Sequence, residues 1–335
     1  MPRLGCVGAP LDTTPLPSEH GFILTSLLVA ATGGHLAELH HLAARLPTDE
    51  RVWVTFDTPQ SRSMLINEAD VLFAPYSSTR DLVGTARDAL YARSLFKTRR
   101  FDCAVSTGAA IAVAFLPLAS HYEIPSHYIE SATRLVGPSV TGKLLQPFRS
   151  VHLYTQHPQW ADRRWTYAGS IFDDFTAKEV PEKKVRKVVV SVGMHKKYGF
   201  RRLLERLAQV IPGEVDVLWQ VGYTDVTGLG LDGVVSVPQP ALSEAMREAD
   251  VVISHAGVGS ALQAFECGRR PILIPRSFAH GEHVDDHQRV LASELEDLGL
   301  AAKCDASTID YADIIAAASW EVEANASSKP FVLRG

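Results

Sequence analysis

The stretch of sequence that decides the fold is Val251-Val252-Ile253-Ser254-His255-Ala256-Gly257-Val258-Gly259-Ser260. Its first three residues are β-branched, as in a buried strand, and the glycines predict a tight turn into a helix over residues 260–267. Glycine lets the backbone approach an anion, and the free N–H groups at a helix start favour a phosphate. The stretch therefore predicts a strand, a turn and a helix that bind a diphosphate.

A second strand and a second polar loop follow directly. Residues 271–275 are typical of a strand, and the loop over residues 276–286 ends at His287-Gln288. Parallel strands end at the same edge of a sheet, so both loops are placed to contact one ligand. We expect that ligand to be a nucleotide sugar.

Composition limits the function classes. The chain has 335 residues, 46% of them hydrophobic and 21% charged, which favours two domains with substantial cores. Its net charge of -5 gives no global reason to bind nucleic acid. The cysteines, Cys6, Cys103, Cys267 and Cys304, lie far apart, which argues against a zinc site and fits reduced thiols. We expect a cytoplasmic protein without a cysteine-bound metal.

The two ends of the chain differ in composition from its middle. Residues 1–20 contain four prolines and no apolar signal-peptide segment, which predicts a disordered leader. Residues 323–335 read as a polar tail. The longest apolar runs, residues 22–31 and 109–119, are shorter than the roughly 20 residues that span a bilayer.

Strands alternate with helices along two halves, residues 21–178 and 179–322. The first half predicts strands at residues 22–30, 52–56, 71–74, 103–106, 126–129 and 151–154, with helices at 36–46, 61–68, 81–96 and 109–120. The second predicts strands at residues 188–192, 215–221, 234–237, 251–253 and 272–274, with helices at 200–210, 241–248, 260–267, 286–298 and 311–320. Residues 172–186 are charged and contain Pro181, which indicates an interdomain linker. The alternation predicts two Rossmann-like α/β domains with parallel sheets that face each other across a cleft.

The chain resembles GT-B glycosyltransferases of the family 28 type. The second half, with Val190-Ser191-Val192-Gly193, the 254–260 turn and Asp286-His287-Gln288, is similar to the catalytic subunit of the eukaryotic UDP-GlcNAc transferase acting on dolichol-linked GlcNAc. The first half, with Gly33-Gly34-His35 and Tyr128-Ile129-Glu130-Ser131, resembles its membrane-recruiting partner subunit. Bacterial exopolysaccharide glycosyltransferase pairs share this division, and the peptidoglycan N-acetylglucosaminyltransferase carries both halves in one chain. The resemblance covers residues 22–302 and predicts a fusion of such a pair.

The resemblance implies a set of site residues. The implied donor-binding residues are Gly193, His255, Ala256, Gly257, Val258, Gly259, Ser260, Gln263, Asp286, His287 and Gln288. The implied acceptor-binding residues are Gly33, Gly34, Glu130 and Ser131. The family usually carries a ribose-binding glutamate five residues before its closing glycine, which is Gly268 here, and this chain has Gln263 at that position. An amide can bind a ribose hydroxyl, but without the charge-assisted strength of a carboxylate.

Two residues compete for the role of catalytic base. His35 follows the Gly33-Gly34 turn, and a neutral imidazole there can take the acceptor proton, since the ordinary pKa of histidine is about 6.5. Its alternative role is to cap the turn or orient a phosphate. Glu130 is the rival base, and its alternative role is to form an ion pair with Arg134.

The acidic pairs at residues 173–174 and 285–286 are interpreted as surface or capping groups, so no metal is expected.

The first half also offers a candidate membrane contact. Residues 80–100 carry six basic and two acidic side chains beside apolar ones, as in a helix that lies on an anionic bilayer, where each basic residue contributes about 1 kcal/mol. The alternative is a core-facing helix with a solvated cationic side. Residues 142–149 add a second candidate contact. We expect a cytoplasmic protein, and the membrane-contact interpretation places it peripherally on the inner face of the plasma membrane.

These observations favour an inverting glycosyltransferase that moves a sugar from a UDP-sugar to an acceptor hydroxyl. The expected acceptor is a polyprenyl-diphosphate-linked saccharide of cell-surface or exopolysaccharide synthesis, and the UDP-sugar is a substrate, so no cofactor is expected. Alternatives are transfer to a soluble natural product, UDP-sugar 2-epimerisation, and a non-catalytic sugar-nucleotide sensor or partner subunit.

Overall fold

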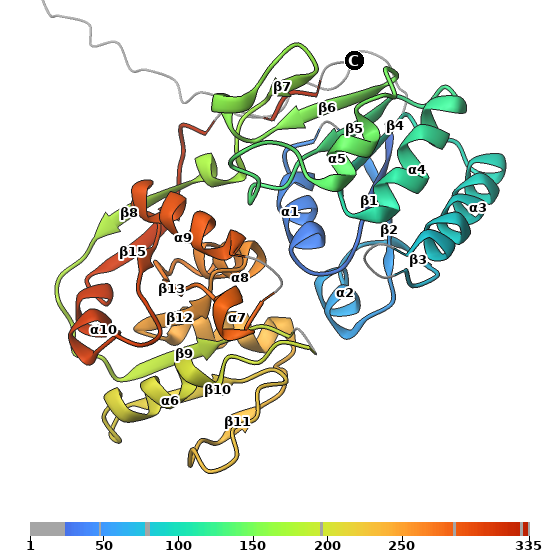
Figure 1. Ribbon diagram of the computed structural model, residues 1–335. Coiled ribbons are helices and arrows are strands. Elements are labelled where there is room, and N and C mark those ends of the chain that lie inside the picture. Colours follow the sequence, from blue (N-terminus) through green and yellow to red (C-terminus); the bar gives the residue numbers. More distant parts are fainter. Residues whose placement is uncertain are drawn as a thin grey trace, which may run out of the picture.

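The computed structural model describes residues 24–46, 48–77, 81–194, 197–283, 286–328 and 331–333. The leader predicted at residues 1–20 lies outside them. The described chain forms two α/β domains, each built on a parallel sheet (Figure 1). The predicted fold class is therefore confirmed.

The N-terminal domain has a seven-stranded sheet in the order β3-β2-β1-β4-β5-β6-β7. Its strands are β1 (Thr25–Ala30), β2 (Glu50–Phe56), β3 (Asp70–Ala74), β4 (Cys103–Gly108), β5 (Ser126–Ile129), β6 (Val151–Thr155) and β7 (Trp165–Tyr167). Its helices are α1 (Gly34–Ala43), α2 (Pro59–Met64), α3 (Leu82–Thr98), α4 (Ala110–His121), α5 (Val140–Leu145) and the 3-10 helix η1 (Pro158–Trp160). Helix α2 begins before the predicted residue 61 because Thr58 and Ser61 form a capping box.

The C-terminal domain has a six-stranded sheet in the order β11-β10-β9-β12-β13-β14. Its strands are β9 (Lys187–Ser191), β10 (Asp216–Gln220), β11 (Gly233–Val234), β12 (Val251–His255), β13 (Ile272–Ile274) and β14 (Ala302–Lys303). Its helices are α6 (Arg201–Val210), α7 (Gln239–Glu248), α8 (Val258–Glu266), η3 (Phe278–His280), α9 (His287–Asp297) and α10 (Tyr311–Ala317). The edge strand β11 is shorter than predicted because the N–H of Val237 donates to Oε1 of Gln220 instead of joining the ladder.

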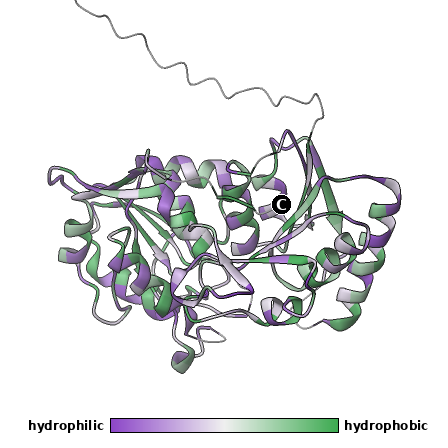
Figure 2. Cartoon of the chain, turned by 90° about the horizontal axis from the view of Figure 1, so that it is seen from above, coloured by the Kyte–Doolittle hydropathy of each residue, from purple (hydrophilic) through white to green (hydrophobic). Residues whose placement is uncertain are grey.

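The cores follow from the apolar pattern of the sequence. In β1, Leu27, Leu28 and Val29 are fully buried, as expected for a parallel strand covered on both faces. In α6, the buried residues Leu203, Leu204 and Leu207 share one face of the helix. Hydrophobic strands run through the interior of both domains, with hydrophilic residues on the outer helices (Figure 2). None of the helices in the described part of the chain is both long and apolar enough to span a membrane.

The predicted linker pairs with the end of the predicted C-terminal domain and with the first two residues of the predicted tail. Within residues 172–186, the 3-10 helix η2 (Ile171–Asp174) leads into β8 (Phe175–Glu179), which pairs antiparallel with β15 (Trp320–Ala324). Beyond β15 the chain returns to the N-terminal domain, where Phe331 is 1% exposed and packs against Tyr154. Residues 323–324 and Phe331 are thus built into the fold, which the prediction of a polar tail did not anticipate because the apolar run Phe331-Val332-Leu333 is short and follows mostly polar residues.

The two domains are joined along α1 and α8. Both helices contribute to one hydrophobic core, in which Leu36 and Leu39 of α1 lie with Ala261 and Phe265 of α8. Helix α2 also contacts α7, since the N–H of Gln239 donates to Oγ of Ser63 over 3.2 Å. The ends of the strands that precede α1 and α8 are therefore held close together.

Candidate active site

Each sheet has one position where its strand order reverses. In the N-terminal sheet this position lies between β1 and β4, and in the C-terminal sheet between β9 and β12. Open α/β sheets bind ligands outside the carboxyl ends of the strands at such a position. The turn at residues 32–35 follows β1 and the turn at residues 256–259 follows β12, so both glycine turns predicted from the sequence lie where a ligand is expected.

The helices that begin at these positions lack side-chain caps. Helix α1 starts after Gly33, α4 after Ala109 and α8 after Gly257, and none of these residues makes a side-chain capping bond. By contrast, Asp81 caps α3 and Ser139 caps α5. Uncapped helix starts leave N–H groups available to an anion.

The first turns of α1 and α8 contact each other across the domain boundary. A Cβ atom placed on Gly34 would lie 2.8 Å from Cγ1 of Val258, and one placed on Gly259 would lie 3.4 Å from Cβ of Ala37. The absence of side chains at both glycines allows this close approach. The structure thus brings predicted acceptor residues together with predicted donor residues.

His35 lies at the start of α1 with its ring against the end of β4. A Cβ on Gly108 would lie 3.0 Å from Cε1 of His35, and Oγ1 of Thr107 donates to the main-chain oxygen of His35 over 2.7 Å. Its Nδ1 is buried and has no hydrogen-bond partner among the described residues. Burial lowers the pKa of His35, and the charge of Arg134 adds to this effect. The imidazole is therefore neutral at neutral pH, and its buried Nδ1 is an unsatisfied polar atom of the described structure.

His255 has a matching environment in the C-terminal domain. A Cβ on Gly193 would lie 2.7 Å from its Cε1, and one on Gly257 would lie 2.6 Å from its Nε2. Gly193 also has a φ of 82°, a conformation that other residues rarely adopt. Burial, reinforced by the charge of Arg276, lowers the pKa of His255 to about 3. His255 is thus a neutral imidazole packed against Gly193 and Gly257, and its Nδ1 has no partner in the described structure.

The other predicted donor residues divide into main-chain and side-chain roles. Ala256 and Val258 are buried, so they present only main-chain groups, whereas Ser260 is partly exposed. Nε2 of Gln263 donates to Oγ of Ser243 over 3.1 Å, which leaves its carbonyl oxygen as an acceptor.

The residues that start α9 organise the loop after β13. Oε1 of Gln288 accepts the N–H of Arg276 over 3.0 Å, and Oδ1 of Asp286 accepts the N–H of Phe278 over 3.0 Å. The ring of His287 packs edge-on against His283 with 4.8 Å between centroids. The bonds made by Asp286 and Gln288 therefore shape the loop from within.

Glu130 is fully buried and both of its carboxylate oxygens accept hydrogen bonds. Oε1 accepts from Tyr128 Oη over 3.0 Å and from the N–H of Ser131 over 3.2 Å. Oε2 accepts from the N–H and the Oγ of Ser139 over 2.8 and 3.0 Å. Burial raises its pKa, and the bonds from Ser139 oppose this. The side chain thus fastens the loop over residues 131–139, and the alternative pairing with Arg134 is not among the ion pairs of the described residues.

A second buried carboxylate, Glu38, was not predicted from the sequence. It accepts hydrogen bonds from Ser131 Oγ over 2.6 Å, from the N–H of Ala132 over 2.9 Å and from Nε2 of Gln156 over 3.1 Å. Burial raises its pKa to about 7, against the effect of these bonds. Glu38 lies three residues after His35 on α1, and it ties that helix to the same loop. Its only signal in the sequence is an acidic residue between apolar positions of the helix.

Metal-binding groups and cavities add little to this region. The described residues contain no group of three or more histidine, cysteine, aspartate or glutamate side chains that is arranged to hold a metal ion. Asp173 takes part in a capping box on η2, and Asp174 bonds to His41 and Arg45.

Two cavities, of about 180 and 510 Å³, lie at the carboxyl edge of the C-terminal sheet, and Arg202 lines both of them.

Comparison with known proteins supports the predicted resemblance. Residues 188–312 match the glycosyltransferase family 28 C-terminal domain. Over 312 residues the chain is 21% identical to the UDP-N-acetylglucosamine–N-acetylmuramyl-(pentapeptide) pyrophosphoryl-undecaprenol N-acetylglucosamine transferase of Sulfurovum sp. (strain NBC37-1), and the match covers 87% of this chain and 89% of that protein.

Two solved structures show the same two-domain arrangement. MurG of Acinetobacter baumannii matches with a TM-score of 0.55 and 19% identity, over 87% of this chain and 88% of its own. The glycosyltransferase SnogD of Streptomyces nogalater matches with a TM-score of 0.56 and 16% identity, over 88% of this chain and 91% of its own. At these identities the likeness establishes the GT-B fold.

Proposed function

We propose that this chain, a GT-B glycosyltransferase whose C-terminal domain is of family 28, moves a sugar from a UDP-sugar to an acceptor hydroxyl with inversion of configuration. One observation carries the proposal. The uncapped first turns of α1 and α8 belong to different domains and meet beside His35. A transfer between two substrates requires such a meeting of two binding sites.

The C-terminal domain binds the donor in this proposal. The N–H groups at the start of α8 accept the diphosphate, and the glycines of the turn let it approach the backbone. The carbonyl oxygen of Gln263 accepts a ribose hydroxyl, since its amide nitrogen already donates to Ser243. Helix amides stabilise the negative charge of the departing UDP, so the scheme requires no metal ion.

His35 acts as the general base. Its neutral imidazole takes the proton of the acceptor hydroxyl while that oxygen forms a bond to the anomeric carbon, and the carbon–oxygen bond to UDP breaks with its electron pair leaving on the diphosphate. The unpartnered Nδ1 and the lowered pKa of His35 support this role. Both oxygens of Glu130 are occupied within the protein, which favours a role for Glu130 in holding the acceptor loop.

The proposed acceptor is a sugar linked to a polyprenyl diphosphate. The name of the Sulfurovum relative specifies a pyrophosphoryl-undecaprenol acceptor. Helices α3 and α5 flank α4 and expose apolar side chains together with cations, a surface that we call the α3–α5 surface. Its exposed residues are Tyr76, Leu82, Val83, Arg87, Leu90, Arg93, Lys97, Val136, Val140, Lys143, Leu144, Phe148 and Arg149.

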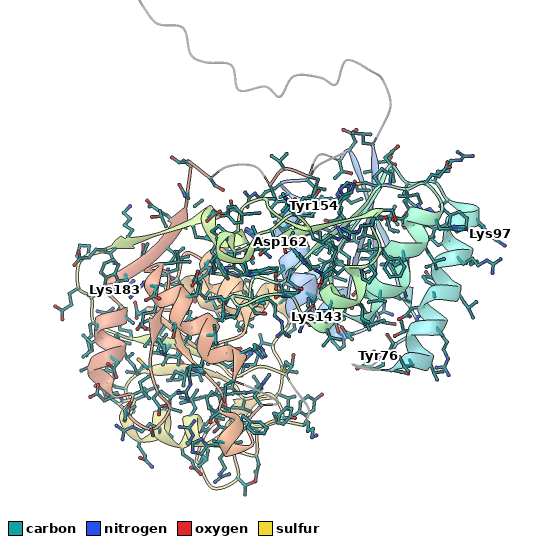
Figure 3. All side chains as sticks on the ribbon, turned by 45° about the horizontal axis from the view of Figure 1, so that its top comes forward. Tyr76, Lys97, Lys143, Tyr154, Asp162 and Lys183 are labelled. Carbon is teal, nitrogen blue, oxygen red and sulfur yellow. The ribbon has the colours of Figure 1, made fainter. Side chains whose placement is uncertain are left out.

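The α3–α5 surface fits an anionic membrane. Leu82 is 83% exposed and Leu90 67%, although both lie on a helix whose other face is buried. Lys97 extends outward from the far end of α3 (Figure 3). Apolar side chains that insert between lipids and cations that contact headgroups would bring the N-terminal domain to a lipid-linked acceptor at the cytoplasmic face.

The function is tested by UDP release from a panel of UDP-sugars, with and without a polyprenyl-diphosphate-linked sugar. We expect release that depends on the lipid-linked acceptor, and a loss of about 10²–10⁴-fold in kcat for His35→Ala with donor affinity retained. Release with a soluble acceptor alone would favour the natural-product alternative, and UDP-sugar binding without any turnover would favour a sensor. Full turnover by His35→Ala would remove the histidine from its catalytic role.

Membrane binding needs a separate test. Vesicles with and without phosphatidylglycerol are floated with the wild type and with Leu82→Ser/Leu90→Ser. We expect flotation that requires the anionic lipid and weakens in the variant. Equal recovery with neutral vesicles, or an unaffected variant, would contradict the assignment of the α3–α5 surface.

A further inference from the structure

Arg276 is a buried cation, and no carboxylate among the described residues forms an ion pair with it. It follows β13 and Pro275, and its side chain is 3% exposed. One guanidinium nitrogen donates to the main-chain oxygen of Val192, and Nε is buried with no hydrogen-bond partner in the described part of the chain. The Phe200 ring lies 5.8 Å from its Cζ. A buried charge normally has a carboxylate or ligand beside it, because desolvation of an unpaired charge is costly.

Glu282, the described acidic residue whose charge acts on Arg276, is already engaged. Glu282 accepts hydrogen bonds from Nε and Nη2 of Arg202 over 3.1 and 3.0 Å, and another from the main-chain N–H of Ser277 over 3.0 Å. It therefore has little capacity left to compensate a second guanidinium. Burial lowers the pKa of Arg276 to about 10, and Glu282 only partly offsets this, so the side chain stays charged at neutral pH.

The position of this charge matches the donor site. Val192, to which Arg276 bonds, precedes Gly193, and Gly193 lies against the ring of His255. The charge of Arg276 also acts on His255, whose pKa it helps to lower. His255 is neutral, so it brings no positive charge to a phosphate. A cation directly behind the glycine turn would supply that charge.

We infer that Arg276 provides the positive charge that binds the donor diphosphate beside the turn at residues 255–259. This inference rests on the proposed function. Arg276 is held by Gln288, which accepts its main-chain N–H, and by Val192, so its guanidinium is fixed before the donor arrives. The diphosphate gains a charge-assisted bond, and it brings a counter-charge to a guanidinium that forms no ion pair within the described part of the chain.

The experiment is calorimetric titration of the wild type and of Arg276→Gln with UDP, UMP and uridine. We expect Arg276→Gln to lower the affinity for UDP by about 10- to 100-fold, which is the range of one hydrogen bond to a charged group, and to leave uridine binding unchanged. Arg276→Lys, which keeps the charge, should lose less. An unchanged affinity for UDP, or an equal loss for UDP and uridine, would overturn the inference.

A matched control lies at the other end of the same strand. Arg270 precedes β13, is partly buried, and donates to the main-chain oxygens of Gly299 and Ala301 over 2.6 and 3.0 Å. Arg270→Gln should leave UDP affinity unchanged. If Arg276→Gln does not fold, the affinity of Arg276→Lys for UDP is compared with that of the wild type instead. If the wild type binds none of UDP, dTDP, GDP and ADP, the proposed function itself fails. If the wild type binds UDP and Arg276→Gln binds it equally well, only the inference about Arg276 fails.

Discussion

Substitution of His41 is predicted to weaken the joint between the domains in a pH-dependent way. His41 lies on α1, and its Nε2 is 2.9 Å from Asp174 in η2 while its Nδ1 is 3.0 Å from Glu266 in α8. Burial opposes the charge of His41, but the bonds to these two carboxylates outweigh it and raise its pKa to about 9. The imidazolium thus links the N-terminal domain, the connecting segment and the C-terminal domain.

The stabilisation that His41 contributes can be calculated from the shift in its pKa. A rise from 6.5 to about 9 corresponds to about 3 kcal/mol at 1.36 kcal/mol per unit. Because Glu266 is 45% exposed, solvent screening reduces the stabilisation to about 1–2 kcal/mol. The folded-state pKa is raised, so this stabilisation is complete below pH 6.5 and is lost as the pH rises through about 9.

The assay is urea unfolding of the wild type and of His41→Gln at pH 6.0, 7.5 and 9.5 and constant ionic strength, followed by tryptophan fluorescence. We expect the variant to be less stable by about 1–2 kcal/mol at pH 6.0, with the difference shrinking toward zero at pH 9.5. His121→Gln, at an exposed histidine in α4, is the control and should show no such trend. A difference that is constant or grows with pH would refute the reasoning.

Three further predictions concern the site. Gly193→Ala should lower the free energy of unfolding, measured by urea unfolding, by about 1–2 kcal/mol and should weaken UDP binding, because it places a Cβ against His255 at a positive φ. The control Gly213→Ala should change neither, since there is open space around Gly213. The acidic limb of the pH profile of kcat/KM should lie below pH 6.5, since burial lowers the pKa of His35, and a limb at or above 6.5 would contradict this. Gln263→Glu should tighten UDP binding in calorimetry by about 3- to 10-fold through a charge-assisted bond to the ribose, and weaker binding would place the ribose elsewhere.

Much of the fold was predictable because it follows from local patterns. The apolar runs of β1, β9 and β12 and the glycines after them indicate strand, turn and helix without knowledge of tertiary contacts. The pairing of β8 with β15 was not predictable, since it joins residues 175–179 to residues 320–324 and the charged sequence between residues 172 and 186 is typical of a loop. The burial of Phe331 depends in the same way on a distant partner, Tyr154.

The site was predictable where the chemistry lies in the backbone. The turns around Gly34 and Gly257 are visible in the sequence because few residue types permit them. Glu38 and Arg276 were not predicted as residues of the candidate site, because their burial depends on elements far away in the chain. Glu130 was recognised as a residue of the loop, but only the structure shows that Tyr128 and Ser139 occupy its carboxylate.

The ribbon formed by β8 and β15 has a mechanical consequence. The chain enters the C-terminal domain through β8 and leaves it through β15, and Asn325, just after β15, bonds to the main-chain oxygens of Asp173 and Asp174 just before β8. Both connections between the domains therefore lie side by side in one two-stranded ribbon, which is the expected hinge for a movement of one domain against the other. If the first turns of α1 and α8 separate, this ribbon would guide the movement, and it would return the turn at residues 255–259 to His35 in the same register.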